Sequence, residues 1–300
     1  MDISVIIVSF NTKEFTTNCI ESIFCQTRDI SFEVILVDNA STDGTADFFR
    51  NDDRITLICS DQNLGFGRGN NLGLEKATGD YIFFLNSDTI LLNNALKLLF
   101  DFMQSDNRAR QLGVLGCLLQ NGDGQPSLSY NDFPSPASEY AYLVGKLKKT
   151  LFDKNIRCHP EDSNIDFFHV NFVTGAAMFI PAKMLRKVGA FDPQFFLYYE
   201  ETDLQKRIAD AGYKRAVIRG PRIIHLEGGS NEERKKFSFF MLMQSTRSLH
   251  IYMRKHFHGI EYFTFRSLMI VLRTTILFDR RFTWEQKRRF CRLILLGQVI

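Results

Sequence analysis

Short apolar runs that alternate with helix-like segments are the feature that most restricts how this chain can fold. The runs are rich in β-branched residues, which is typical of buried strands, and the segments between them carry apolar residues at helical spacing. We expect strands at residues 3–10, 32–37, 55–59, 81–85, 112–119, 172–180, 216–218 and 222–226, and helices at 12–27, 90–104, 182–189 and 200–212. This alternation predicts an α/β fold with a doubly wound, mostly parallel sheet.

Polar residues stand directly after three of these predicted strands. They are Asn11, the pair Asp38-Asn39 and the triplet Asn86-Ser87-Asp88. In doubly wound sheets, ligands bind outside the carboxyl ends of the strands. The sequence therefore predicts a functional site at that edge of the sheet.

Charge is distributed unevenly along the 300 residues. Residues 231–300 contain 14 Lys and Arg against 5 Asp and Glu, whereas residues 1–230 contain 23 against 29. A chain of this length has room for one large domain and a smaller appendage. We expect a main domain over residues 1–230 and a basic, mainly helical extension over 231–300. Because no nucleic-acid-binding module accompanies the basic charge, the sequence favours an anionic membrane surface over a nucleic acid as its partner.

The extension interleaves apolar, aromatic and basic residues at helical spacing, as helices that lie in a membrane interface do. Arg266 and Arg273 are seven residues apart and therefore share one helix face. No stretch of about 20 residues is free of charge, so a membrane-spanning helix is not expected. The alternative to membrane contact is an ordinary helical cap or a dimer face.

Cysteine usage and the N-terminus bear on the compartment. The six cysteines are scattered without a CxxC pair, so neither a zinc site nor a disulfide framework is predicted, and a reducing cytosol fits best. Met1 and Asp2 lead directly into a predicted strand rather than a signal peptide. We expect a cytoplasmic protein, peripheral on the inner face of the cytoplasmic membrane.

Six segments in order resemble family 2 glycosyltransferases with the GT-A fold, most closely bacterial rhamnosyltransferase-like members. They are VIIVSFN (5–11), VILVDNASTDGT (34–45), NLGFGRGNNLGL (63–74), GDYIFFLNSDT (79–89), VTGAAMFIPAKMLRKVGAFDPQFFLYYEETDLQKRIADAGYK (173–214) and IIHLEGGS (223–230). The resemblance implies a nucleotide-binding half over about 1–115 and an acceptor half over about 116–230. It also implies inverting transfer of a sugar from dTDP-rhamnose or a UDP-sugar to a hydroxyl of a saccharide acceptor, lipid-linked, in bacterial surface polysaccharide synthesis.

The first strand ends supply candidate residues for the nucleotide. Asp38 could accept a hydrogen bond from the imide N–H of uracil or thymine, and the resemblance implies that role. The alternative is that Asp38 caps the next turn. Ser9 and Asn11 are predicted to line the same pocket.

A glycine-rich segment follows the third predicted strand. Its glycines allow close backbone approach, and the start of the following helix offers N–H groups to a phosphate. The resemblance places Gly65, Phe66 and Asn71 against the nucleoside and ribose. A tight glycine turn is the alternative.

Asn86-Ser87-Asp88 occupies the position of the family's DxD motif, with Asn in place of the first carboxylate. A divalent cation can bridge protein oxygens and a diphosphate. The resemblance implies that Asp88 and His225 bind Mg²⁺ or Mn²⁺, with Asn86 as a weaker contact. The substitution leaves the identity of the metal open.

Glu200-Glu201-Thr202-Asp203 opens a predicted helix after an aromatic loop. Inverting transfer needs one base to take the proton of the acceptor hydroxyl. The resemblance places this base at Glu201, where the family usually has Asp, with Glu200 as the rival. Asp203 is expected to support the site or the helix start, and to pair with Arg207 one turn later.

Two other functions are weighed against sugar transfer. A nucleotidyltransferase would need a glycine-rich, basic loop directly after the first strand, where this chain has SFNTKEF (9–15). A non-catalytic sugar-binding descendant of the family would not need Asp88, Glu201 and His225 together. These features argue against both functions, which are kept as the alternatives to sugar transfer.

Overall fold

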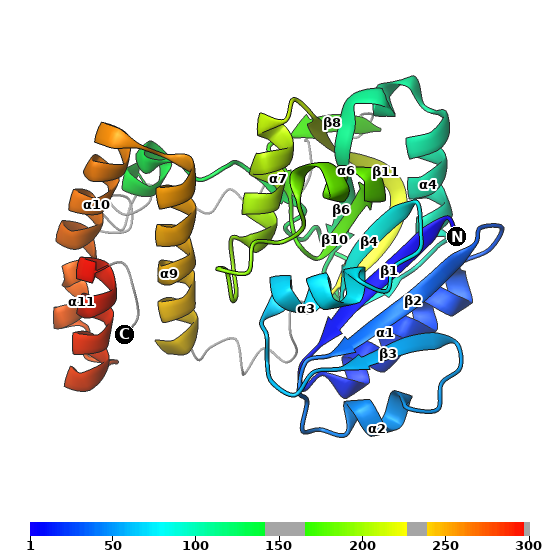
Figure 1. Cartoon of the computed structure of the whole chain (residues 1–300), viewed down its shortest axis with the longest axis horizontal. Coiled ribbons are helices and arrows are strands. Elements are labelled where there is room, and N and C mark those ends of the chain that lie inside the picture. The colour runs from blue at the N-terminus through cyan, green and yellow to red at the C-terminus, as the bar shows by residue number, and fades with distance from the viewer. Residues whose placement is uncertain (142–165, 227–238, 297–300) are drawn as a thin grey trace. The chain divides into compact units, whose positions relative to one another are not determined.

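The computed structural model describes residues 1–141, 166–226 and 239–296, which form two compact units (Figure 1). The first unit comprises Met1–Asp132, Ile156–Pro193 and Glu201–Gly229, and the second comprises Phe133–Asn155, Gln194–Glu200 and Ser230–Ile300. Residues 227–230 of the motif IIHLEGGS, and residues 231–238 and 297–300 of the expected extension, lie outside the described residues.

The first unit is built on a nine-stranded sheet with the order β3-β2-β1-β4-β10-β6-β11-β5, in which β8 also pairs with β11. β1, β2, β3 and β4 are parallel neighbours, as are β6 and β11. Because β10 is antiparallel to both β4 and β6, these six strands all run in one direction, which confirms the mostly parallel sheet. The strands are β1 (Ile3–Ser9), β2 (Phe32–Asp38), β3 (Ile55–Cys59), β4 (Tyr81–Asn86), β5 (Thr89–Leu91), β6 (Leu112–Gln120), β8 (Phe167–Val170), β10 (Ala177–Pro181) and β11 (Lys214–His225). A separate pair joins β7 (Tyr130–Asn131) and β9 (Phe172–Val173).

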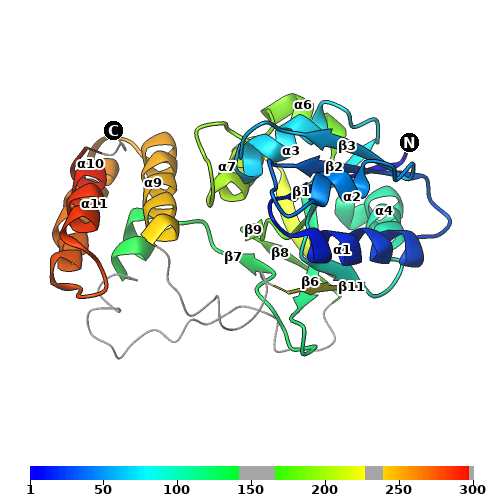
Figure 2. The same cartoon turned by 90° about the horizontal axis from the view of Figure 1, so that it is seen from below.

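Helices cover both faces of the sheet because successive residues of each buried strand point to opposite sides. Val5 and Ile7 belong to one core and Ile6 belongs to the other. Figure 2 shows α1 and α4 on one side and α3 and α6 on the other. The helices of this unit are α1 (Lys13–Gln26), α2 (Thr45–Phe49), α3 (Phe66–Leu74), α4 (Ala95–Ser105), the short η1 (Asn107–Gln111), α6 (Ala182–Val188) and α7 (Glu200–Asp210).

Three predictions differ from the structure. The strand expected at 172–180 is two strands, β9 and β10, which belong to different sheets. The helix expected from residue 90 begins only at Ala95, because Thr89–Leu91 pairs with β11 as the edge strand β5. The strands expected at 216–218 and 222–226 are one strand, β11, whose register shifts between Ile218 and Ile223. Gly220 lies at this shift with a φ of 112°, a conformation that favours glycine, so the strand continues through the irregularity.

The described part of the second unit after residue 238 is mainly helical, as predicted for the extension. It contains α9 (Phe239–His256), α10 (Gly259–Arg273), η2 (Thr274–Phe278) and α11 (Trp284–Leu296). Two apolar clusters hold these helices together, one around Tyr252 and Phe265 and one around Phe290 and Leu293. No helix among the described residues has both the length and the apolar character needed to cross a membrane.

Candidate active site

The polar residues that follow β1, β2 and β4 meet at one edge of the sheet. Ser9 stands opposite Asp38 in the register of β1 and β2. The hydroxyl of Thr12 links the strand ends, since it lies 3.0 Å from the Ser9 hydroxyl and 3.1 Å from that of Ser87. Ser9 also shares a 2.9 Å hydrogen bond with Thr16 and is fully buried, so its hydroxyl is held within the protein.

Asp38 combines burial with an unused hydrogen-bond acceptor. Its side chain is 3% exposed, and one oxygen, Oδ2, accepts a bond from the backbone N–H of Ser41 at 3.3 Å. The other oxygen, Oδ1, is buried without a hydrogen-bond partner among the described residues. Buried carboxylate oxygens are nearly always hydrogen-bonded, so a ligand N–H would supply what Oδ1 lacks. Oδ1 is therefore available for the predicted hydrogen bond from a pyrimidine imide.

Asn39 and Asn63 shape the glycine-rich segment, a role that the sequence did not reveal. Asn39 Nδ2 donates to Asn63 Oδ1 at 3.0 Å and to the carbonyl of Gly65 at 3.3 Å, while its Oδ1 accepts from the N–H of Leu64. Gly65 has a φ of 81°, which favours glycine, and α3 begins at the next residue. A polar residue directly after a strand was the signal available, but it indicated only a turn.

Two asparagines predicted to contact the nucleotide have hydrogen bonds to protein backbone. Asn11 Oδ1 accepts from the N–H of Thr42 at 2.7 Å. Both amide atoms of Asn71 bind the backbone of Phe191, with Nδ2 donating to its carbonyl at 2.8 Å and Oδ1 accepting from its N–H at 3.0 Å. The Phe66 ring meets Phe191 edge to face at 6.0 Å. These contacts make Asn11 and Asn71 positioning residues of the loops, and any contact with donor stays a prediction.

Asn86, Asp88 and His225 converge on one imidazole nitrogen. His225 Nε2 lies 3.3 Å from Asp88 Oδ1 and 3.4 Å from Asn86 Nδ2. The pairing of β11 with β5 fixes this approach, because His225 stands opposite Thr89. Thr89 in turn donates its hydroxyl to the carbonyl of Asn86 at 2.8 Å, which holds the turn in place. The DxD position and the distant histidine are thus adjacent in the fold.

The spacing of these side chains fits a divalent cation. Two cis ligands of an octahedral ion with bonds of about 2.1 Å stand about 3 Å apart, close to the observed 3.3 Å between Asp88 and His225. Carboxylate and imidazole are both ligands that Mn²⁺ and Mg²⁺ accept. Among the described residues no group of three His, Cys, Asp or Glu gathers around one point. The described protein ligands would therefore be few, and the remaining ligands would come from phosphate and water.

Glu201 lies at the start of α7 beside two residues of the predicted donor and acceptor segments. A Cβ added at Gly175 would meet the Glu201 side chain at 3.5 Å and the Phe66 ring at 3.7 Å, so the glycine leaves room for both. Burial raises the pKa of the Glu201 carboxyl, and the N–H groups of Glu201 and Thr202 partly oppose this rise. Glu200, the rival, is 3% exposed.

Asp203 forms the predicted pair with Arg207. Asp203 is fully buried, and its Oδ2 accepts from Arg207 Nε at 2.9 Å. The same guanidinium donates to the carbonyls of Val188, Gly189 and Ala190. The Asp203–Arg207 pair therefore holds the segment that precedes Phe191, which supports the site without touching the reacting atoms.

Replacing Asp203 with Ala is expected to lower the free energy of unfolding by about 3 kcal/mol, because Arg207 keeps a buried charge without its partner. Asp210→Ala on the same helix is the matched control, since its pair with Lys206 is exposed and should contribute less than about 0.5 kcal/mol. Urea unfolding of both variants measures the difference, and equal losses would contradict the buried role of Asp203.

The chain matches one family model and several curated relatives. The model of glycosyl transferase family 2 matches residues 4–189. The glycosyltransferase GlyG of Streptococcus pneumoniae is 32% identical over 48% of this chain and 44% of its own length. The N-acetylglucosaminyl-diphospho-decaprenol L-rhamnosyltransferase of Mycobacterium tuberculosis is 24% identical over 64% of this chain and 66% of its own length. The chain thus spans less than two thirds of the length of these relatives.

Solved structures show the same fold. A mannosyltransferase from Pyrobaculum calidifontis, determined in complex with GDP-Man and Mn²⁺, superposes with a TM-score of 0.55 at 15% identity. The match covers 98% of this chain and 85% of that one. The predicted GT-A fold is thereby confirmed.

Proposed function

Because the chain belongs to glycosyl transferase family 2, we propose that it transfers a sugar from a nucleotide diphosphate donor to an acceptor hydroxyl with inversion at the anomeric carbon. One observation carries the proposal: the Asp88–His225 pair lies at the same sheet edge as the buried, unpartnered oxygen of Asp38. In this proposal the pair would hold the cation that binds the diphosphate, and Asp38 would bind the base of the same donor.

Asp38 selects the base of the donor in this proposal. A uracil or thymine presents one imide N–H, which matches the single buried acceptor, Oδ1 of Asp38. The hydrogen bonds within the glycine-rich segment keep Gly65 and Phe66 in place beside this pocket. The donor is accordingly dTDP-rhamnose or a UDP-sugar.

Asp88 and His225 would hold Mg²⁺ or Mn²⁺. When bound, the cation supplies positive charge that stabilises the leaving diphosphate. Asn86 lies against His225, with its amide nitrogen 3.4 Å from Nε2. This arrangement gives the substituted motif one carboxylate and one neighbouring amide.

Glu201 acts as the base in a single displacement. Its carboxylate takes the proton of the acceptor hydroxyl while that oxygen attacks the anomeric carbon, and the bond to the diphosphate breaks. Attack from the side opposite the leaving group inverts the configuration. The raised pKa of Glu201 suits this role, because a stronger base removes the hydroxyl proton more readily.

The acceptor in this proposal is a lipid-linked saccharide of a bacterial surface polysaccharide. The mycobacterial relative supports it, because its name describes a sugar acceptor joined through a diphosphate to decaprenol.

Incubation with a panel of nucleotide sugars and Mn²⁺, read as released UDP, dTDP or GDP, tests the proposal. We expect release from a pyrimidine donor, and Asp38→Ala should weaken donor binding about tenfold to a hundredfold, the value of a hydrogen bond to a charged group. Asp61→Ala, an exposed acid of the same unit, is the control. Release from none of the donors would favour a non-catalytic descendant of the family.

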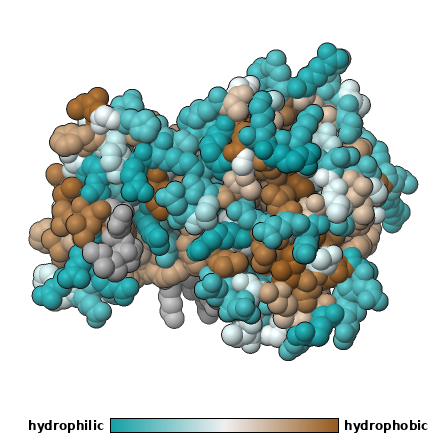
Figure 3. Space-filling view, viewed as in Figure 1, coloured by the Kyte–Doolittle hydropathy of each residue, from teal (hydrophilic) through white to brown (hydrophobic). Residues whose placement is uncertain are grey.

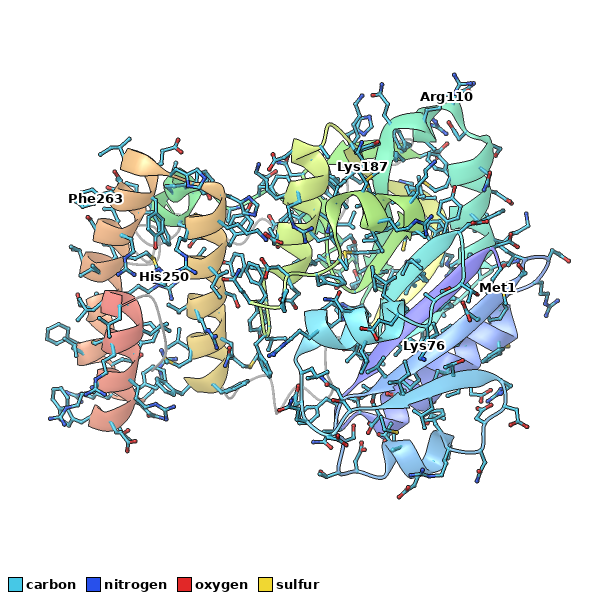
Figure 4. All side chains as sticks on the ribbon, viewed as in Figure 1. Met1, Lys76, Arg110, Lys187, His250 and Phe263 are labelled. Carbon is cyan, nitrogen blue, oxygen red and sulfur yellow. The ribbon has the colours of Figure 1, made fainter. Side chains whose placement is uncertain are left out.

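The helical unit is the part that we propose to contact an anionic membrane, on the inner face of the cytoplasmic membrane. Ile260, Phe263, Val271 and Phe278 are between 66% and 86% exposed along α10 and η2. Figure 3 shows hydrophobic surface over α10, and Figure 4 shows Phe263 pointing away from the other helices of this unit. Exposed Arg288, Arg289 and Arg292 on α11 supply positive charge for an anionic leaflet. Burial of the apolar side chains would add the hydrophobic contribution.

Phe263→Ser and Phe278→Ser are each expected to weaken sedimentation with anionic vesicles by about tenfold or more, from the about 1.5–3 kcal/mol of a buried phenylalanine. Phe48→Ser removes an equally apolar ring that is 53% exposed in the first unit. Equal losses in all three variants would argue against an apolar membrane face in the helical unit.

A further inference from the structure

The helical unit contains a small cavity whose polar lining is basic. The cavity has a volume of about 230 Å³. Its lining residues come from α9, α10 and the end of α11: His250, Ile251, Arg254, Tyr262, Arg266 and Leu296. None of the described lining residues is acidic. The cavity is smaller than the roughly 300–1,000 Å³ of sites for drug-sized ligands, so a small anionic group fits it better than a whole nucleotide sugar.

His250 is buried in the wall of this cavity, and its ring nitrogens form no hydrogen bond with the described residues. It is 2% exposed. Its ring packs against Phe265 at 5.6 Å, and Figure 4 shows it between α9 and the neighbouring helices. Burial, with Arg266 and Arg273, lowers the pKa of His250 to about 4, so the ring is neutral near pH 7 and offers one N–H donor. Unpaired buried polar atoms are unfavourable, so a ligand here would stabilise the unit.

The two cavity arginines carry positive charge that no described carboxylate at the cavity balances. Arg266 donates one N–H to the carbonyl of Leu295 at 2.5 Å, but its second terminal nitrogen is buried and has no partner in the part of the chain that the structure describes. Arg254 is exposed and forms no ion pair with any described residue. Guanidinium groups stay charged at all ordinary pH values, and an uncompensated buried charge is costly. An anion in the cavity would remove that cost.

We propose that this cavity binds a phosphate group, either of a soluble phosphate compound or of a phospholipid head group. A phosphate offers several acceptor oxygens in a compact volume, and the guanidinium fork matches its geometry. Arg254 supplies a donor at the rim, Arg266 supplies the second charge, and the His250 N–H supplies the inner donor. The cavity residues are separate from Asp38, Asp88, Glu201 and His225, so the inference does not depend on the proposed sugar transfer.

Calorimetric titration of the full-length chain with inorganic phosphate, and sedimentation with vesicles, test the inference. Vesicles of phosphatidylcholine alone are compared with vesicles that also contain phosphatidic acid. Arg254→Gln is expected to weaken binding about tenfold, whereas Arg110→Gln removes the same charge from an exposed position in the first unit and should change it little. Saturation by inorganic phosphate alone identifies a soluble ligand, and Arg254-dependent binding to phosphatidic acid vesicles identifies a lipid head group.

His250→Phe separates a binding role from a structural one. Phenylalanine fills a similar space against Phe265 and leaves no buried polar atom unpaired, so the melting temperature should rise while phosphate binding falls. No saturable binding of either phosphate source would overturn the inference. Equal weakening by Arg254→Gln and Arg110→Gln would also overturn it, because the binding would then reflect the general charge of the protein.

Discussion

Replacement of Glu201 with Gln is expected to reduce the rate of sugar transfer by about 10²–10⁴-fold, the usual contribution of general base catalysis. Gln keeps the size of the side chain, and therefore its packing beside Gly175 and Phe66, but it cannot take the acceptor proton. Single-turnover measurements with saturating donor isolate the chemical step. Donor affinity should stay close to the wild-type value, since Glu201 acts on the acceptor.

Glu200→Gln is the matched variant, because the same change is made one residue away. If its loss of rate exceeds that of Glu201→Gln, the base is Glu200 instead. The pH profile gives an independent readout. Burial raises the Glu201 pKa above its ordinary 4.5. A base works only when ionised, so kcat/KM should fall as the pH drops through this raised value, and this acidic limb should be absent from the residual activity of Glu201→Gln.

Asp88→Asn is expected to reduce metal-dependent transfer at least about a hundredfold, because the amide cannot match the charge that a carboxylate offers a divalent cation. The Asp88–His225 distance of 3.3 Å should change little, since both side chains are held by the β5–β11 pairing. Titration of Mn²⁺ against UDP-dependent thermal stabilisation measures the loss without requiring an acceptor.

Asp53→Asn is the control for this variant, because Asp53 is an exposed acid of the same unit. It should retain wild-type Mn²⁺ dependence. A wild-type response to Mn²⁺ in Asp88→Asn would contradict the metal role of Asp88, whatever the activity of the variant.

Sequence patterns were sufficient to predict those elements whose structure is decided by local periodicity. β3 and the register-defining alternation of Val5, Ile6 and Ile7 follow directly from the order of apolar residues. Residues 90 and 91 were misread as the start of a helix, because the three residues of β5 that pair at the sheet edge carry too little periodic signal.

The contacts that build the site were less accessible from sequence, because they join residues far apart. Asn71 binds Phe191 across 120 positions, and His225 approaches Asn86 across 139. The resemblance to a family pointed to His225, but no local pattern shows which strand it faces. Gln205 gives no sequence signal either, although its buried amide binds both backbone groups of Val173.

The Asn71–Phe191 contact has a consequence for recombining this chain with its relatives. Asn71 belongs to the half that we assign to the donor, and Phe191 belongs to the half assigned to the acceptor. A chimera that exchanges only one half inherits only one side of this two-bond contact. We therefore expect that the two halves cannot be exchanged independently of each other. A chimera would need Asn71 and the segment around Phe191 to come from the same parent.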